Sequence, residues 1–372
     1  MGIFNKKGSK FYSLKNVLKK QAQYYLIFGE RSSGKTFATL ELILKNYWKK
    51  GEQGAYIRRW GDDIKGIRGE NIWSGLIDAD KIKEITNGEY ESVIYKGRAF
   101  YLARYNDKLQ KMVSNEEPFC YIFAISEDER IKGANYPRIT TVVFDEFMTR
   151  SYYLPNEFKR LLSIVSTIAR QRDNIKIFLL GNTVNEYCPY FEEFGINHIV
   201  KTMQPGDIRE VAYEDREAKV VLEWTEPNVD GKASDIFFEG FDKSGMITTG
   251  KWETLQYPAT PYSIKDDMIT FKFYINFNDE IMQGDVVENE DDYFIHIHKK
   301  TTDIMDEYPI YQLDFNPSPQ YYTSLTRGRD KCSGEIAYLI NSNKIFVQNN
   351  RIGEMVRNYI MMSENRSILN YK

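Results

Sequence analysis

The sequence predicts an α/β P-loop NTPase domain with a mostly parallel sheet, followed by a smaller α+β domain. Two observations predict the first domain: a glycine-rich motif joins a strand to a helix, and apolar strands alternate with helices over roughly the first 200 residues. Alternating apolar and polar strands beyond residue 263 predict the second domain. A chain of 372 residues exceeds the size of one hydrophobic core, so two domains are expected. We place the first domain at 1–224, a linker or small subdomain at 225–262, and the C-terminal domain at 263–372.

The elements of the first domain follow from apolar runs and their spacing. Residues 24–28 form a short apolar run that ends at a glycine, which is typical of a buried strand. Apolar residues then recur at helical spacing from Phe37 to Trp48, and Gly51 is the expected helix stop. The next elements are expected, in order, as a strand at 55–59, a hairpin over 92–105 with its turn at 96–97, a strand at 140–144, a helix at 158–169 and a strand at 175–180.

The second domain is predicted from a change of residue composition after Trp224, where a polar, glycine-containing stretch begins. Residues 269–277, 293–298 and 344–347 alternate in polarity, so we expect them to form antiparallel strands. A last helix is expected from Ile352 to about Met362.

Composition and charge bound the class of protein. Hydrophobic residues make up 42% of the chain and charged residues 28%, which is typical of a globular protein. No run of about 18 apolar residues predicts a membrane span. The net charge of −3 gives no overall basic surface for nucleic acid, although the first 20 residues are basic and residues 279–292 are acidic. The net charge therefore does not exclude a local basic surface that binds nucleic acid.

Cysteines and histidines predict no metal site. Cys120, Cys188 and Cys332 are widely spaced and form no CxxC pair, which favours a reducing, intracellular setting. His296 and His298 fall on one face of an alternating strand, but we expect no zinc site there.

The strongest motif is a phosphate-binding loop of the form GxxxxGK[ST], placed between an apolar strand and an amphipathic helix. Its residues are Gly29, Glu30, Arg31, Ser32, Ser33, Gly34, Lys35 and Thr36. Backbone N–H groups and the helix N-terminus suit phosphate, Lys35 suits the β- and γ-phosphates, and Thr36 suits Mg²⁺. The loop therefore predicts ATP and Mg²⁺ binding. Arg31 is either a solvated loop-tip residue, an extra cation near the γ-phosphate, or a contact to a neighbouring subunit.

Two adjacent carboxylates, Asp145 and Glu146, end the predicted strand at 140–144. Ligands bind at this edge of open α/β sheets. We expect Asp145 to hold the metal and Glu146 to be the general base for water attacking the γ-phosphate. The alternative is a strand that merely ends in two solvated acids.

Asn182 and four arginines are further candidates. Asn182 ends the following strand and either senses the γ-phosphate or forms a simple turn. Arg170 and Arg172 either stabilise a helix C-terminus or include a finger supplied to a neighbouring subunit. Arg58 and Arg59 face nucleotide, DNA or solvent.

Several segments, in order, resemble the genome-packaging ATPases of small tailed bacteriophages, the phi29-like packaging motors. The segments are Gly29-Glu30-Arg31, Gly51-Glu52-Gln53 before Tyr56-Ile57-Arg58-Arg59, Asn135-Tyr136-Pro137 before Val143-Phe144-Asp145-Glu146-Phe147, Leu154-Pro155-Asn156-Glu157, Arg170-Gln171-Arg172, and Gly181-Asn182 before Pro189-Tyr190-Phe191. They cover residues 24–192 well and the rest poorly. The polar loop residues 30–33 and the stretch after Ile199 depart from the family pattern.

The resemblance implies a ring motor of the additional-strand, catalytic-glutamate class. It implies a pentamer in the host cytoplasm, transiently docked on the portal of a viral prohead, that drives double-stranded DNA inward, with a structural RNA as a further possible partner. By position, Arg170 matches the family's trans-acting finger, and Lys132 lies where the family has a basic residue near the neighbour's site. The C-terminal domain would resemble a ribonuclease-H-like fold that has lost its catalytic acids.

The residues of the C-terminal domain support an inactive scaffold. The expected first strand, 271–277, carries no central aspartate, and Asp279 and Glu280 come only at its end. Asp314 lies between apolar residues, but no second and third acid that would complete a metal site with it is evident. The acidic residues that follow are expected in a solvated hairpin turn: Asp285, Glu288, Asp291 and Asp292. Lys299, Lys300 and residues 327–331 are either phosphate contacts for DNA or RNA, or solvated loops.

The leading hypothesis is therefore a DNA-translocating packaging ATPase. A P-loop switch or scaffold that gates assembly is the first alternative, and a dedicated base at Glu146 argues against it. A terminase that also cleaves DNA is the second, and the missing acids argue against it.

Overall fold

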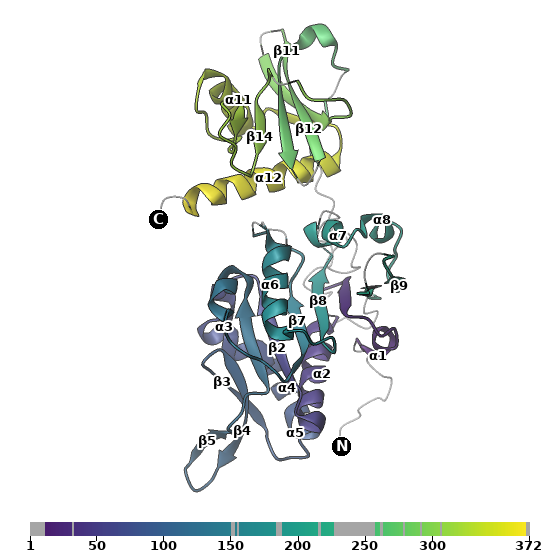
Figure 1. Cartoon of the computed structure of the whole chain (residues 1–372), viewed down its shortest axis with the longest axis vertical. Coiled ribbons are helices and arrows are strands. Elements are labelled where there is room, and N and C mark those ends of the chain that lie inside the picture. Colours follow the sequence, from purple (N-terminus) through teal and green to yellow (C-terminus); the bar gives the residue numbers. More distant parts are fainter. Residues whose placement is uncertain are drawn as a thin grey trace, which may run out of the picture. The chain divides into compact units, whose positions relative to one another are not determined.

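The computed structural model describes residues 12–31, 33–149, 153–154, 156–183, 188–214, 217–226, 257–260, 263–277, 280–290, 292–305 and 307–369. The chain divides into two compact units (Figure 1). Unit 1 comprises Met1–Arg150 and Asn156–Glu253, and unit 2 comprises Ser151–Pro155 and Thr254–Lys372. Among the described residues, no helix is both long and apolar enough to cross a membrane.

Unit 1 is built on a ten-stranded mixed sheet in the order β3-β4-β6-β2-β7-β8-β1-β10-β9, with β5 paired to β4. The central strands from β6 to β10 are parallel, and the strands at both margins are antiparallel. The parallel strands are β1 (Tyr24–Gly29), β2 (Gln53–Arg58), β6 (Cys120–Ala124), β7 (Ile139–Asp145), β8 (Lys176–Asn182) and β10 (Val220–Trp224). The marginal strands are β3 (Ser92–Lys96), β4 (Ala99–Asn106), β5 (Lys111–Ser114) and β9 (Ile208–Val211). This confirms the predicted α/β class with a mostly parallel sheet.

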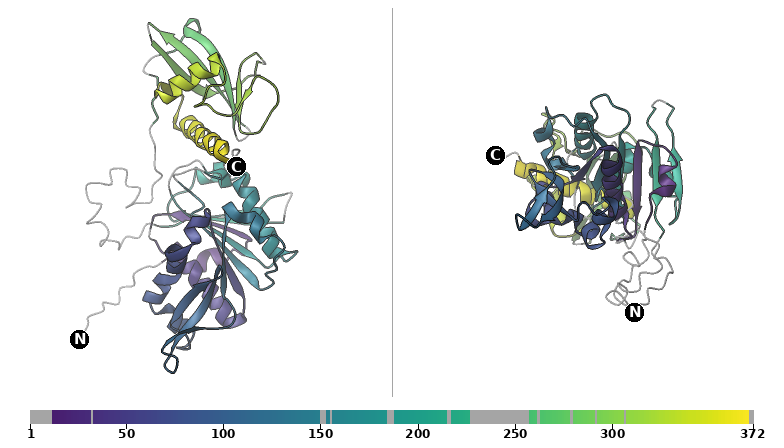
Figure 2. Two further views of the ribbon diagram at one scale, coloured as in Figure 1. Left: turned by 90° about the vertical axis from the view of Figure 1, so that its left-hand side faces the viewer. Right: turned by 90° about the horizontal axis from the view of Figure 1, so that it is seen from below.

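Helices cover both faces of this sheet because the central strands are apolar on both sides. Tyr25 and Ile27 of β1 pack with the α2 side chains Ile43 and Leu44, whereas Phe28 contacts Phe191 of α7 on the other face. Figure 2 shows the helical layers on either side of the strands. The helices are α1 (Lys15–Leu18), α2 (Lys35–Lys50), α3 (Gly66–Glu70), α4 (Ser74–Asp78), α5 (Lys81–Ile85), α6 (Glu157–Ala169), α7 (Pro189–Glu193) and α8 (Asn197–Val200), with 3-10 turns at Gly61–Ile64, Asn71–Trp73 and Ile125–Ile131.

The predicted strands, helices and hairpin of unit 1 are all present, with boundaries shifted by one or two residues. The β3–β4 hairpin turns at Gly97 and Arg98, both with positive φ, one residue later than predicted. Sequence analysis missed β9 and β10, which extend the sheet beyond the phosphate-loop strand. Most of the expected linker, from Pro227 to Gln256, lies outside the described residues.

Unit 2 has a six-stranded sheet in the order β15-β14-β11-β12-β13-β16. Its strands are β11 (Ile269–Phe277), β12 (Glu280–Asn289), β13 (Asp292–Lys299), β14 (Ile310–Gln312), β15 (Tyr321–Tyr322) and β16 (Ile345–Val347). A 3-10 turn spans Asp266–Met268, and the helices are α11 (Lys331–Asn341) and α12 (Asn350–Leu369). Strands β11, β12 and β13 form an antiparallel meander, in which β11 and β13 match predicted strands and β12 was not predicted.

Two expectations for unit 2 are wrong. Strand β16 runs parallel to β13, not antiparallel, because α11 precedes it and brings the chain back in the same direction. The acidic segment does not form the expected turn, because β12 continues to Asn289 and β13 begins at Asp292. Glu290 has positive φ, and Asp291 lies outside the described residues. Asp285 is therefore buried in mid-strand and Glu288 lies near the strand end.

Candidate functional site

The phosphate loop connects β1 to α2 at the carboxyl edge of the parallel strands. Gly29 has φ of 150°, and a Cβ there would lie 2.2 Å from Oγ1 of Thr225, the residue after β10, so only glycine fits. Gly34 has φ of 95° and is the N-cap of α2, a left-handed position that glycine adopts without strain. Ser32 lies outside the described residues.

The Lys35 ammonium points into the loop, and the residue is only 6% exposed. Its Nζ donates to the Glu30 carbonyl oxygen at 2.6 Å and to Ser33 Oγ at 3.0 Å, and lies 3.5 Å from Asn182 Oδ1. Burial lowers the pKa of Lys35 to about 8, against the opposing effect of Asp145 and other nearby carboxylates. The structure thus brings the predicted residues of the loop and of β8 together around one cation.

The Asp145 carboxylate joins the phosphate loop to β7. Its Oδ2 accepts hydrogen bonds from Thr36 Oγ1 at 3.0 Å and from the Tyr56 hydroxyl at 2.6 Å. Burial and the nearby Asp145 charge raise the pKa of Tyr56 well above its usual value, so the hydroxyl stays a neutral donor. A hydroxyl and a carboxylate oxygen on adjacent elements fit the ligand preference of Mg²⁺.

Glu146 has a strained backbone directly after the β7 strand. Its φ is +63°, a left-handed conformation that is uncommon outside glycine and often marks functional sites. Its N–H donates to Asp145 Oδ1 at 3.1 Å, and its side chain is 51% exposed. The carboxylate therefore projects from the sheet edge beside Asp145, where a water molecule can reach it.

Arg58, at the end of β2, lies close to both of these carboxylates. Its Nη2 lies 2.6 Å from Glu146 Oε2 and its Nη1 lies 3.9 Å from Asp145 Oδ2. Sequence analysis left open whether this arginine faces nucleotide, DNA or solvent. In the structure it lies beside Asp145 and Glu146.

Arg59 is not solvated, which excludes one of the alternatives left open for it. Its guanidinium is buried and binds both oxygens of Glu157, at 2.8 and 3.0 Å. It also donates to the carbonyl oxygens of Glu146 and Phe147, at 3.0 and 2.8 Å. The Tyr190 hydroxyl donates to Glu157 Oε1 at 2.7 Å. This network fixes the backbone that follows Asp145.

Tyr12 and Glu223 are site neighbours that sequence analysis missed. The Tyr12 N–H lies 3.4 Å from the Ser33 carbonyl oxygen, and its hydroxyl donates to Glu223 Oε2. Burial raises the pKa of Glu223 to about 7, while the Tyr12 hydroxyl and Lys35 act to lower it. The available signal was a carboxylate inside the apolar run 220–224, which is unusual for a buried strand.

The remaining predicted cations lie away from this cluster. Among the described residues, Arg31 and Arg170 form no hydrogen bond or ion pair with Asp145 or Glu146. Arg31 is exposed on the loop, and the Arg170 Nη2 donates to the Ala134 carbonyl oxygen at 2.6 Å. Arg172 donates to carbonyl oxygens of α6 and of residues before and in β7, which is a structural role. Lys132 pairs with Glu129 at 2.5 Å.

No group of three carboxylates that could hold a metal ion comes together in the described part of unit 2. Strand β11 carries no acid, Asp279 lies outside the described residues, and Asp314 follows β14. Three residues that could bind a metal ion do lie together in this unit, namely Asp285, His296 and His298.

The amino-acid sequence is similar to one protein family and to individual phage proteins. A family model for the podovirus DNA encapsidation protein (Gp16) matches residues 6–207. A DNA packaging protein of Bacillus phage B103 is 26% identical over 304 residues, which cover 73% of this chain and 87% of that protein. A DNA packaging protein of Bacillus phage phi29 is 28% identical over 191 residues, which cover 50% of this chain and 51% of that protein.

Two solved structures share the fold along most of the chain. The phi28 gp11 DNA packaging motor matches with a TM-score of 0.58 and 17% identity, covering 96% of this chain and 99% of that one. The bacteriophage phi29 genome packaging motor assembly matches with a TM-score of 0.58 and 18% identity, covering 95% and 99%.

Proposed function

Because this chain belongs to the podovirus DNA encapsidation protein family, we propose that it hydrolyses ATP to translocate double-stranded DNA into a viral prohead. One observation carries the ATPase part of the proposal. Thr36 of the phosphate loop is hydrogen-bonded to Asp145 of β7, which places Lys35, Asp145 and Glu146 at one edge of a parallel sheet. Hydrolysis of a nucleoside triphosphate needs this combination of cation, metal ligands and base.

Strand order supports the additional-strand, catalytic-glutamate class. Strand β8 lies between the phosphate-loop strand β1 and the acidic strand β7, so one strand separates the loop from the carboxylates. Asn182 ends this strand and lies near Lys35 Nζ, which suits a sensor of the γ-phosphate.

In the proposed mechanism, Lys35 and loop N–H groups hold the β- and γ-phosphates, and Thr36 and Asp145 hold Mg²⁺. When bound, Mg²⁺ supplies positive charge against the phosphate oxygens. Glu146 accepts the proton of the water that attacks the γ-phosphorus, and the bond from that phosphorus to the bridging oxygen of ADP breaks. Arg58 must release Glu146 before that carboxylate can act as base.

The proposed assembly is a homo-oligomeric ring, a pentamer, that acts in the host cell on the portal of a prohead, with DNA and a structural RNA as partners. The B103 and phi29 relatives are DNA packaging proteins, and the phi29 structure is of a packaging motor assembly, which supports this proposal. We propose that Arg170 acts on the neighbouring subunit and that Lys132 lies near that interface. The exposed position of both side chains, away from their own carboxylate cluster, supports these roles.

For unit 2 we propose a ribonuclease-H-like scaffold without nuclease activity, so that unit 1 is the ATPase domain. The antiparallel meander β11–β13 with β14 parallel to β11 supports the fold. The absence of a carboxylate triad among the described residues supports the lack of nuclease activity.

A nucleotide switch that gates assembly is the second candidate. The ion pair between Arg58 and Glu146 favours it, because a paired carboxylate is a poor base.

Steady-state ATP hydrolysis with Mg²⁺, with and without linear double-stranded DNA and at several protein concentrations, tests the proposal. The Glu146→Gln protein is the blank. Stimulation by DNA that rises faster than protein concentration is expected for an assembling motor. Hydrolysis that ignores both DNA and protein concentration would reject the motor in favour of the switch.

A further inference from the structure

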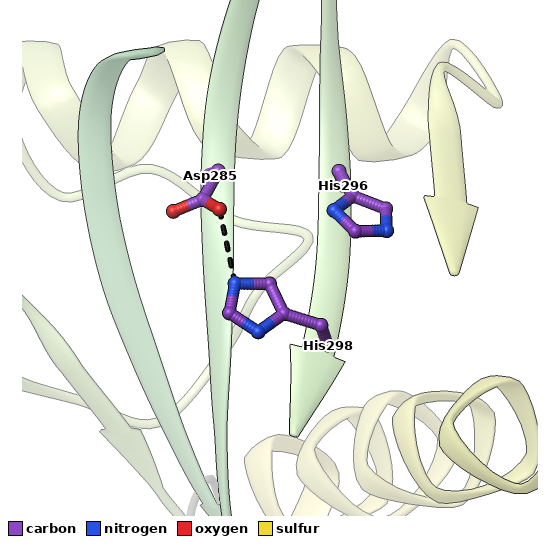
Figure 3. A group of neighbouring side chains, drawn as sticks. All are labelled: Asp285, His296 and His298. Atoms are coloured by element: carbon purple, nitrogen blue, oxygen red, sulfur yellow. Dashed lines mark hydrogen bonds and ion pairs between the residues drawn. The ribbon is translucent and has the colours of Figure 1, made fainter. Parts of the chain in front are cut away.

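Three potential metal ligands lie on one face of the β12–β13 ladder. Asp285 is directly opposite His296, and His298 lies two residues further along the same strand and therefore on the same face (Figure 3). Their ligand atoms all lie within 4.8 Å of one another. Because side chains alternate between the two faces of each strand, the hairpin brings these three residues onto one face, although Asp285 and His298 are thirteen positions apart in the chain.

The cluster is partly enclosed. Asp285 is only 4% exposed, and both histidine rings are partly buried. His298 Nε2 lies 3.0 Å from Asp285 Oδ2, and the two imidazole rings stack with their centroids 5.5 Å apart. A buried carboxylate needs a compensating positive charge, which a proton on His298 or a metal ion can supply.

Neighbouring groups hold two of the ligands in a suitable orientation. The outer nitrogen of His298, Nδ1, lies 3.1 Å from the Lys299 carbonyl oxygen, which leaves Nε2 directed at Asp285. Gln283 Nε2 donates to Asp285 Oδ1 at 2.6 Å and leaves Oδ2 for the cluster. Metal-binding histidines and carboxylates usually have such outer hydrogen bonds. Within the described part of the chain, no hydrogen bond engages the His296 ring.

We propose that Asp285, His296 and His298 bind one divalent transition-metal ion, Zn²⁺ or an ion of similar preference. Two imidazoles and one carboxylate favour Zn²⁺ over Mg²⁺ and Ca²⁺, which prefer oxygen ligands. Ligand bonds of about 2.0–2.2 Å require the three donor atoms to close around the ion by side-chain rotation. Three protein ligands leave the fourth tetrahedral position to water. The site is in unit 2 and is independent of the ATPase proposal.

Zn²⁺ titration of the chelator-treated full-length protein, followed by calorimetry in excess Mg²⁺, tests the site. We expect one saturable Zn²⁺ per chain, and Co²⁺ in its place should give visible bands of a tetrahedral or five-coordinate ion without thiolate charge transfer. His296→Gln should weaken Zn²⁺ binding at least about tenfold, because one of only three protein ligands is lost. His198→Gln is the matched control, since His198 is exposed on α8 in unit 1, and should leave the affinity unchanged.

His296 is the best position to substitute because its ring carries no hydrogen bond in the described structure, and circular dichroism checks that the variant folds. Gln283→Leu, which removes the donor to Asp285, should weaken binding by about 10- to 100-fold. Absence of saturable binding would overturn the proposal and leave an ion pair of Asp285 with protonated His298. Binding that His296→Gln leaves intact, or that Cys332→Ser removes, would also overturn it.

Discussion

Arg58 Nη2 lies 2.6 Å from Glu146 Oε2, so the proposed general base forms an ion pair within its own subunit. Arg58 ends β2 and Glu146 directly follows the neighbouring parallel strand β7, where a left-handed backbone directs it away from the strand. The pair links the base to a second carboxylate, because Arg58 also approaches Asp145.

Replacement of Arg58 by alanine is expected to raise DNA-independent ATP hydrolysis and to reduce its stimulation by DNA. Ion pairs with an exposed partner are worth about 0.2–1 kcal/mol, so the expected rise is about 1.4- to fivefold. Steady-state hydrolysis with and without DNA measures it. Arg68→Ala is the control, because Arg68 is exposed and pairs only with Asp63 among the described residues. A fall in basal hydrolysis would instead assign Arg58 a direct role with the nucleotide.

Tyr56→Phe is expected to destabilise the metal-free protein by about 1.5–3 kcal/mol, the value of a hydrogen bond to a charged group. The Tyr56 hydroxyl is buried and donates to Asp145 Oδ2 at 2.6 Å, so its loss leaves that carboxylate with fewer donors. Urea denaturation with a chelator present measures the free energy of unfolding. Tyr47→Phe removes a long bond to the Glu117 carbonyl oxygen and an acceptor for Asn115 Nδ2, which keeps its own bond to that carbonyl. Neither bond involves a charged group, so this variant should change the free energy of unfolding by less. Equal effects of the two substitutions would contradict the importance of the Asp145 contact.

Nucleotide affinity is expected to fall as the pH rises above about 8. Burial lowers the pKa of Lys35 to about 8 in the free protein, so the ammonium loses its proton above that value. Bound phosphates stabilise the charged form, and binding at pH 9 must therefore take up a proton. The expected loss is up to about tenfold per pH unit until the pKa of the complex is reached. Calorimetry of ADP binding at pH 7 and 9, in buffers of different ionisation enthalpy, measures both the affinity and the proton uptake.

Lys35→Arg is the control for this pH dependence, because a guanidinium stays charged throughout the range. Its nucleotide affinity should be lower overall but flat between pH 7 and 9. A wild-type affinity that is equally flat would contradict the lowered pKa of Lys35.

Glu157→Leu is expected to destabilise the protein by about 3–5 kcal/mol, because Arg59 would remain buried without its carboxylate. Tyr190→Phe removes the Tyr190 hydrogen bond to the same carboxylate and should cost less, about 1.5–3 kcal/mol. Chemical denaturation compares the two variants. A smaller loss for Glu157→Leu than for Tyr190→Phe would show that Arg59 finds other partners or water.

The sequence alone predicted the parts of the site that adjoin one another in the chain. The phosphate loop and the pair Asp145 and Glu146 are local motifs, and the sheet edge that unites them follows from parallel strands. Arg58 and Tyr56 were not predicted as partners of the acids, because these contacts span 88 and 89 residues and depend on strand order. Glu223 lies on a strand that sequence analysis missed altogether.

Unit 2 shows the same limit in its polar residues. The buried position of Asp285 depends on cross-strand neighbours, His296 and His298, and the polarity of single residues suggested a solvated turn instead. The direction of β16 depends on the path of the preceding helix, which periodicity does not encode.

If Arg170 acts on a neighbouring subunit, adding Arg170→Ala subunits to wild-type subunits is expected to lower ATP hydrolysis by more than the fraction of variant added. Its backbone is left-handed with φ of +40° after the last turn of α6, and its exposed guanidinium contacts the Ala134 carbonyl oxygen rather than its own carboxylate cluster. DNA-stimulated hydrolysis is measured at a constant total concentration while the fraction of the variant is raised. If one defective subunit stops a ring of five, an equal mixture retains about one thirtieth of the activity, whereas independent subunits retain about half. Lys159→Ala, an exposed change on the same helix, should leave the activity of every mixture unaltered. A decline in proportion to the Arg170→Ala fraction would place the arginine in its own subunit or outside the reaction.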